Sequence, residues 1–180
     1  SLRMNGDLHL IDRTWIMGIL NLTPDSFFEG SRVLGNDVIL RAGEMLEEGA
    51  DILDLGGQST RPGADFLSPK DEADRVIPAI ETIHKEYPKA ILSVDTFHAD
   101  VAQKALDAGA NIINDVSGGI YSPSLFQVAS DRQVPYILTH IRGEPKNMQK
   151  NPQYDDVVNE VFRYFKEKID QLISMGVHDI

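Results

Sequence analysis

The feature that most constrains the fold is a regular alternation of short apolar segments with longer amphipathic ones. Segments that predict buried strands lie at residues 15–21, 51–56, 91–95, 111–115 and 136–140. Between and after them, residues 37–48, 69–85, 99–108, 124–131 and 154–175 show the periodicity of helices that bury one face. Strands that alternate with helices through short connections form parallel sheets with right-handed crossovers. The sequence therefore predicts five strand–helix units and the approach to a sixth strand.

A similar junction recurs where three of the predicted helices end. It reads Gly-Ala-Asp-Ile at 49–52, Gly-Ala-Asn-Ile at 109–112 and Gly-Val-His-Asp-Ile at 176–180. In each case a glycine can end the helix in the left-handed conformation, and apolar residues then begin the next strand. Before the first unit, residues 1–13 predict a small hairpin that turns at Asn5-Gly6. Asp37 is expected to cap the first helix.

Residues suited to a ligand pocket end every predicted strand, namely Asn21, Gly56, Asp95, Asn114 and His140. Ligands bind at the carboxyl ends of strands in parallel α/β folds. A five-stranded doubly wound sheet would be self-sufficient at this length, but its polar residues should gather near one switch point. Because all the strands carry them, we favour a (β/α)8 TIM barrel. A whole barrel needs about 250 residues, so residues 1–180 are expected to be the N-terminal part of one barrel domain, with about the first five units.

Composition excludes several classes of function. The chain of 180 residues has 28 acidic and 17 basic residues and a formal charge of −11, which disfavours binding to nucleic acid. It has no cysteine, so disulfides, thiolate catalysis and zinc–thiolate sites are excluded. No apolar run reaches the ~18 residues of a membrane span, and no secretory signal is evident. We expect a cytoplasmic protein without nucleic-acid or membrane partners.

The strand ends and the first two loops offer two kinds of chemistry. Asp95 and Asn114 can hydrogen-bond the edge of a flat nitrogen heterocycle, since a carboxylate accepts two parallel N–H bonds and an amide donates and accepts. Asn21 offers a neutral oxygen that suits Mg²⁺. Thr60 and Arg61 combine a hydroxyl with a guanidinium fork that suits phosphate. Together they predict a heterocycle joined to a phosphate ester.

Each residue also has an ordinary structural interpretation. Asp95 could cap the following helix, and Asn114-Asp115 could belong to a turn before the glycine pair. Arg61 could be a solvated loop charge and Asn21 a strand-end amide. The joint occurrence of these residues after successive strands favours the functional interpretation. His140, as a core histidine, and Arg142, as a structural cation, are left out of the predicted site.

Two longer motifs carry a resemblance to a known family. Residues 17–27, Met-Gly-Ile-Leu-Asn-Leu-Thr-Pro-Asp-Ser-Phe, and residues 56–63, Gly-Gly-Gln-Ser-Thr-Arg-Pro-Gly, resemble the two signature loops of the dihydropteroate synthases. Ser-Val-Asp-Thr at 93–96, Ile-Ile-Asn-Asp at 112–115, and Thr-His at 139–140 followed by Gly-Glu-Pro at 143–145 are similar to the family as well. The similarity covers essentially the whole chain.

The resemblance implies a pterin-binding (β/α)8 barrel that condenses dihydropterin pyrophosphate with p-aminobenzoate, giving dihydropteroate and pyrophosphate in folate synthesis. It assigns Asn21 to a Mg²⁺ cofactor, and Thr60 and Arg61 to phosphate and catalysis. Asp95 and Asn114 would bind the pterin. The pocket for the second substrate would be shaped by Thr60 and Arg61 together with Ser26, Phe27 and Pro62. Two alternatives stay open: a pterin-binding methyltransferase barrel and a non-catalytic pterin-binding fragment.

The chain also departs from the family. Glu29 stands where the family commonly has aspartate; it keeps the charge but adds a methylene in the loop that, by the resemblance, would order around Mg²⁺. The family's further pterin-binding aspartate, its lysine and its final arginine and histidine would lie beyond Ile180. We therefore expect the 180 residues alone to be inactive, and homodimerisation to involve helices that would lie beyond them. The family is the target of sulfonamides.

Overall fold

The computed structural model describes residues 1–4, 6–22, 33–58, 66–142 and 152–180. Its centre is a parallel sheet of five strands that lie side by side in the order of the chain. They are β3 (Met17–Asn21), β4 (Ile52–Gly56), β5 (Ile91–Asp95), β6 (Ile112–Asp115) and β7 (Tyr136–Leu138). A doubly wound sheet reverses its strand order at a switch point, and this sheet has no reversal. Sequential order is that of a barrel wall, so the described residues form part of a (β/α)8 barrel.

The approach to a sixth strand is also present. Beyond the last helix, the carbonyl oxygen of Asp179 accepts a hydrogen bond of 2.8 Å from the backbone N–H of Tyr136, at the start of β7. The carboxylate of Asp179 accepts another, of 3.0 Å, from the backbone N–H of Arg3. The segment after Gly176 therefore lies beside β7, where a sixth strand would begin.

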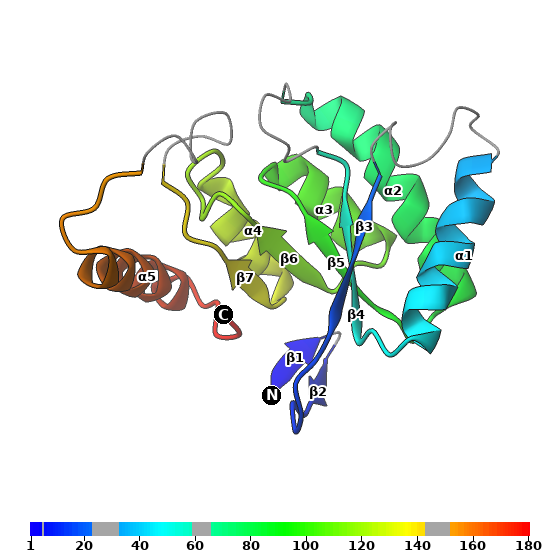
Figure 1. The fold of residues 1–180 in the computed structure, drawn as a ribbon, viewed down its shortest axis with the longest axis horizontal. Coiled ribbons are helices and arrows are strands. Elements are labelled where there is room, and N and C mark those ends of the chain that lie inside the picture. Colours follow the sequence, from blue (N-terminus) through cyan, green and yellow to red (C-terminus); the bar gives the residue numbers. More distant parts are fainter. Residues whose placement is uncertain (5, 23–32, 59–65, 143–151) are drawn as a thin grey trace.

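Five helices follow the strands in alternation: α1 (Val33–Glu47), α2 (Pro69–Glu86), α3 (Ala99–Ala108), α4 (Ser124–Arg132) and α5 (Val157–Ser174). Figure 1 shows α1 to α4 along one side of the sheet, with α5 beyond its β7 edge. Successive residues of a strand face opposite sides of a sheet. Leu20 of β3, on the helix side, is 1% exposed, whereas its neighbour Ile19 is 62% exposed. One face of the sheet is thus packed by helices and the other is open.

Local signals explain where several helices begin and end. At α2, the Ser68 hydroxyl accepts a hydrogen bond from the Asp71 backbone N–H, and Pro69 occupies the first turn, as is common at helix starts. Gly109 ends α3 in the left-handed conformation with φ of 117°. Asp156 caps α5 by accepting from the Asn159 backbone N–H. The glycine junctions predicted from the sequence are present at Gly49, Gly109 and Gly176, all with positive φ.

Some predicted boundaries were wrong. Helix α1 begins at Val33, so Asp37 lies inside the helix and cannot cap it. Helix α5 begins at Val157 rather than at residue 154, because Asp156 supplies the cap. Val157 itself is 51% exposed, so the helix does not bury its first residue. Strand β7 ends at Leu138, two residues earlier than predicted.

A hairpin covers the amino end of the open face. Strands β1 (Leu2–Met4) and β2 (Asp7–His9) pair antiparallel, as predicted, and Figure 1 shows them beside the start of β3. Met4 is buried in a small cluster with Ile52 and Ile112, the first residues of β4 and β6. This apolar layer closes one end of the open face and leaves the carboxyl ends of the strands for polar residues.

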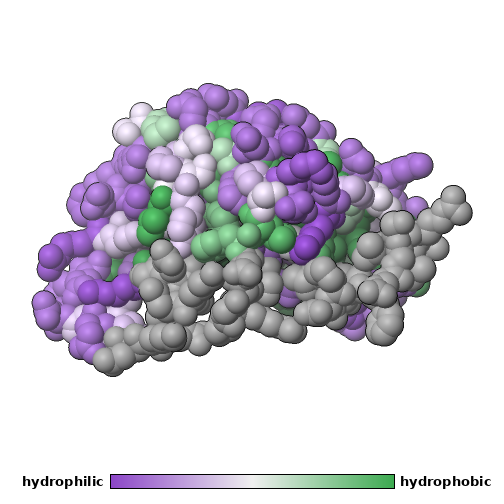
Figure 2. Space-filling view, turned by 90° about the horizontal axis from the view of Figure 1, so that it is seen from above, coloured by the Kyte–Doolittle hydropathy of each residue, from purple (hydrophilic) through white to green (hydrophobic). Residues whose placement is uncertain are grey.

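Hydrophilic residues cover much of the described surface in the view from above, with patches of hydrophobic atoms between them (Figure 2). Within the described residues, no helix combines the length and the apolar character needed to cross a membrane.

Candidate functional site

Four residues from four neighbouring strands lie in one row across the open face. The register pairs Asn21 with Gly56, Gly56 with Asp95, and Asp95 with Asn114. All four stand at or next to the carboxyl ends of their strands, on the face opposite the helices. The structure therefore brings the predicted Asn21, Asp95 and Asn114 together along one rim. Asn21 is exposed, and Asp95 and Asn114 are half-buried.

Asp95 is placed by its neighbour in the row. A Cβ atom at Gly56 would stand 3.2 Å from Asp95 Oδ2, closer than such contacts usually are, so the glycine leaves room for the carboxylate. Burial raises the pKa of Asp95 to about 7, and the negative charges of Asp54, Glu72 and Asp115 add to the increase. The capping interpretation of Asp95 was wrong, because the residue at the start of α3 is His98.

Asn114 is held by a hydrogen bond to Asp54, an acidic residue that the sequence analysis did not single out. Its Nδ2 donates a hydrogen bond of 2.9 Å to Oδ2 of Asp54 on β4. Asp54 is 3% exposed, and burial raises its pKa, with the Ser93 and Asn114 side chains opposing the shift. A signal was available: Asp54 is the one charged residue in the apolar run of β4, and a buried carboxylate requires partners.

Asp115, one residue after Asn114, faces the helices and serves the turn that the alternative interpretation described. Its carboxylate accepts hydrogen bonds from the backbone N–H and hydroxyl of Ser117, at 2.8 and 2.7 Å, and from the backbone N–H of Gly119 at 2.6 Å. It also accepts one from the hydroxyl of Tyr136. The two adjacent residues therefore have different roles: Asn114 faces the open side of the sheet, and Asp115 fixes the loop after β6.

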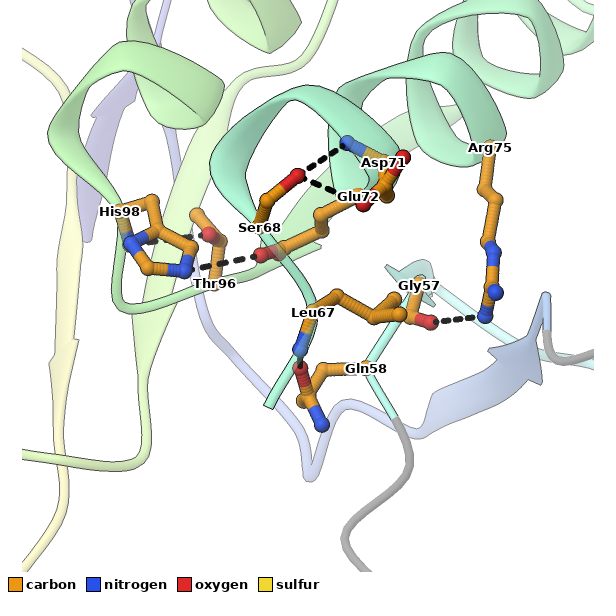
Figure 3. A network of polar contacts seen from close by, with 9 residues as sticks. All are labelled: Gly57, Gln58, Leu67, Ser68, Asp71, Glu72, Arg75, Thr96 and His98. Carbon is orange, nitrogen blue, oxygen red and sulfur yellow. Dashed lines mark hydrogen bonds and ion pairs between the residues drawn. The ribbon is translucent and has the colours of Figure 1, made fainter. Parts of the chain in front are cut away.

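A second buried acid, Glu72 of α2, was also missed. Figure 3 shows it facing Thr96 and His98, with its carboxylate 3.7 Å from Nε2 of His98. Glu72 is 0% exposed. Burial raises its pKa to about 7, with the Thr96 side chain opposing the shift, and burial lowers the pKa of His98. This cluster connects the start of α2 to the loop after β5, directly behind Asp95.

Hydrogen bonds hold the described residues on either side of residues 59–65. The side-chain oxygen of Gln58 accepts a hydrogen bond of 2.8 Å from the backbone N–H of Leu67, and Arg75 donates one of 3.2 Å to the carbonyl of Gly57 (Figure 3). Phe66 packs edge-on against Phe97, with ring centroids 5.2 Å apart. The predicted Ser26, Phe27, Thr60, Arg61 and Pro62, together with Glu29, lie outside the described residues.

Arg142, left out of the predicted site, has structural partners. Its guanidinium forms an ion pair with Glu160 and lies 4.2 Å from the centroid of the Tyr154 ring. His140 packs against the rings of Tyr154 and Tyr164. Both residues help attach α5 to the loop after β7.

The profile of a family described as pterin binding enzyme matches residues 17–180. Among curated proteins, the dihydropteroate synthase of Synechocystis sp. is 44% identical, over 92% of this chain and 57% of its own length. The dihydropteroate synthase of Bacillus subtilis is 42% identical, over 93% of this chain and 56% of its own length. A solved dihydropteroate synthase from Xanthomonas albilineans, with 4-aminobenzoic acid, is 38% identical and superposes with a TM-score of 0.85, over 99% of the chain and 64% of that structure. That from Burkholderia cenocepacia, complexed with 7,8-dihydropteroate, is 36% identical with a TM-score of 0.82.

These relatives are longer than the 180 residues, which span less than two thirds of each of them. Over the part that is shared, the profile covers all five strands of the sheet and the whole row of site residues. The chain belongs to the family of pterin binding enzymes.

Proposed function

We propose that the full-length protein carrying this sequence is a dihydropteroate synthase. It would condense 6-hydroxymethyl-7,8-dihydropterin pyrophosphate with p-aminobenzoate, giving 7,8-dihydropteroate and pyrophosphate. The observation that supports this most is the row of Asn21, Gly56, Asp95 and Asn114 along one rim. It offers hydrogen-bonding groups for a heterocycle at one end and an uncharged oxygen at the other.

Asp95 and Asn114 would bind the pterin. An ionised carboxylate accepts two N–H bonds, and the adjacent amide adds a further polar contact. Both side chains are half-buried at the strand ends, so a flat ring could lie over them and remain open to a second substrate. Their position on rigid strands would fix the orientation of the ring before reaction.

Asn21, Thr60 and Arg61 would serve the diphosphate. Mg²⁺ keeps several waters and is commonly held by one or two protein oxygens together with substrate phosphates. The exposed amide of Asn21 fits such a site, and the described residues contain no cluster of three or more His, Asp or Glu that would enclose an ion. When bound, Mg²⁺ would neutralise charge on the departing diphosphate. The Arg61 guanidinium and Thr60 hydroxyl would hold phosphate oxygens, and Ser26, Phe27 and Pro62 would shape the pocket for p-aminobenzoate.

The chemistry then needs no nucleophile from the protein. As the C–O bond to the diphosphate breaks, positive charge on the methylene carbon can spread into the electron-rich pterin ring. The neutral amine of p-aminobenzoate forms the new C–N bond and afterwards loses a proton. Arg61 would stabilise the negative charge that builds on the leaving oxygens.

The test is an assay of the full-length protein with both substrates and Mg²⁺, measuring pyrophosphate and dihydropteroate. We expect turnover, its loss on chelation of the metal, and competition by sulfonamides with p-aminobenzoate. Asp95→Asn should raise KM for the pterin substrate about tenfold or more, whereas Glu81→Gln, at an exposed position of the same domain, should change nothing. A folded full-length protein that makes no product would refute the proposal.

Two other outcomes would point elsewhere. Binding of methyltetrahydrofolate but not of the pterin pyrophosphate would favour a methyltransferase barrel. Binding of pterin without turnover would favour a non-catalytic role. The 180 residues alone are expected to give no product, and a homodimer remains a prediction for the full-length protein.

A further inference from the structure

The hydrogen bond between Asp54 and Asn114 crosses an intervening strand. Asp54 lies on β4 and Asn114 on β6, and β5 runs between them. The residue of β5 in register with Asp54 is Ser93, which is small and fully buried. A short side chain at this position leaves space for the bond to pass over β5. The two side chains meet at 2.9 Å on the open face of the sheet.

This bond decides which end of the Asn114 amide is available to a ligand. Nδ2 of Asn114 is the donor in this bond, the arrangement that an ionised Asp54 requires because a carboxylate only accepts hydrogen bonds. The carbonyl oxygen of Asn114 and the second N–H of its amide are then left for the pocket. Asp95, beside it in the row, is also an acceptor when ionised.

We propose that Asp54 is a positioning residue for specificity, which fixes Asn114 with its carbonyl oxygen toward the ligand. Together with Asp95, the fixed carbonyl oxygen gives the rim two adjacent acceptors, which favour a heterocycle edge that carries N–H donors. This inference rests on the proposed function, because it assigns the pterin to these two side chains. It adds a residue that contacts no ligand and acts through Asn114.

A double-mutant cycle tests the proposal in the full-length protein. Asp54→Asn keeps the shape but can donate or accept, so the Asn114 amide loses its fixed orientation. We expect KM for the pterin pyrophosphate to rise about tenfold, with KM for p-aminobenzoate unchanged. Because Asp54 acts through Asn114, the same substitution should have little further effect in an Asn114→Ala background. Equal effects of Asp54→Asn in both backgrounds would overturn the proposal.

Asp115→Asn is the matched control, since it changes a buried carboxylate next to Asn114 that faces the other side of the sheet. Its effect should persist unchanged in the Asn114→Ala background. If Asp54→Asn does not fold, a neutron structure of the wild-type protein with 7,8-dihydropteroate gives the answer directly. An amide deuteron of Asn114 toward Asp54, with the amide oxygen toward the ligand, supports the proposal, and the amide oxygen toward Asp54 overturns it. A folded wild-type protein that binds no pterin would instead refute the proposed function, and this inference with it.

Discussion

Replacement of the buried acid Glu72 by glutamine should stabilise the protein, and by more as the pH rises from about 5 to 8. Glu72 is 0% exposed, and among the described residues it forms an ion pair only with His98, whose Nε2 lies 3.7 Å from the carboxylate. Burial lowers the pKa of His98, so this histidine is mostly neutral at pH 7 and above and cannot compensate the carboxylate. Glutamine has nearly the shape of the protonated acid and carries no charge to desolvate.

The magnitude follows from the pKa of Glu72, which burial raises from 4.5 to about 7. Since the folded state holds the proton more tightly than the unfolded chain, protonation contributes stability at low pH, and this is lost as the pH rises from about 4.5 to about 7. Between pH 5 and pH 8 the loss is about 2.5 kcal/mol for one such group. The stability of Glu72→Gln relative to the wild type should therefore rise by about 1–2.5 kcal/mol between pH 5 and pH 8.

Urea unfolding at several pH values between 5 and 8 measures this difference. The free energy of unfolding of the variant should depend less on pH than that of the wild type. Glu81→Gln, at an exposed position of the same helix, removes one negative charge without relieving burial and should follow the wild-type curve within about 0.5 kcal/mol. If Glu72→Gln were less stable than the wild type at pH 8, the carboxylate would be stabilised by contacts that outweigh its desolvation, and the reasoning would be wrong.

Three further predictions follow from single contacts. Asp115→Ala leaves the donors of Ser117, Gly119 and Tyr136 unpaired and should lower the free energy of unfolding by about 3–5 kcal/mol in urea. Gly109→Ala would place a methyl group 2.6 Å from the His84 ring and should lower the melting temperature more than Gly49→Ala, where the same helix-ending conformation faces open space. Pterin binding at pH 7 should release roughly half a proton from Asp95, whose pKa is about 7, measured by calorimetry in buffers of different ionisation enthalpy and abolished in Asp95→Asn.

Local chemistry made much of the fold predictable from the sequence. Apolar runs and the glycines that end helices are signals within a few neighbouring residues, so the sequence alone indicated the strands and most helix ends. The Asp37 cap failed because the segment before it contains Gly35 and Asn36, which favour turns, and yet it belongs to α1. Turn propensity is a weak local signal and did not determine where this helix begins. The sequential strand order, which distinguishes a barrel wall from a doubly wound sheet, was indicated only by the distribution of polar strand ends.

Part of the candidate site could also be predicted from the sequence, and part of it could not. Asn21, Asp95 and Asn114 were found because they end strands, and parallel strands end at one edge. Asp54 and Glu72 were missed because their importance comes from burial and from partners far along the chain. Asp54 is 60 residues from Asn114, and Glu72 of α2 contacts His98 at the start of α3. Such contacts become visible only when the strands are in register.

The distribution of charge along the row indicates how a ligand must lie in it. Asp54, Glu72 and Asp115 are close enough to raise the pKa of Asp95, so the β4–β6 part of the rim repels anions and favours hydrogen-bond donors. The opposite end of the row is the uncharged Asn21. A molecule that joins a donor-rich ring to a diphosphate can satisfy both ends in one direction only, with the ring over the acids and the phosphates toward β3. The repulsion among the acids destabilises the empty site, and under the proposed function the same repulsion would set the orientation of the ligand.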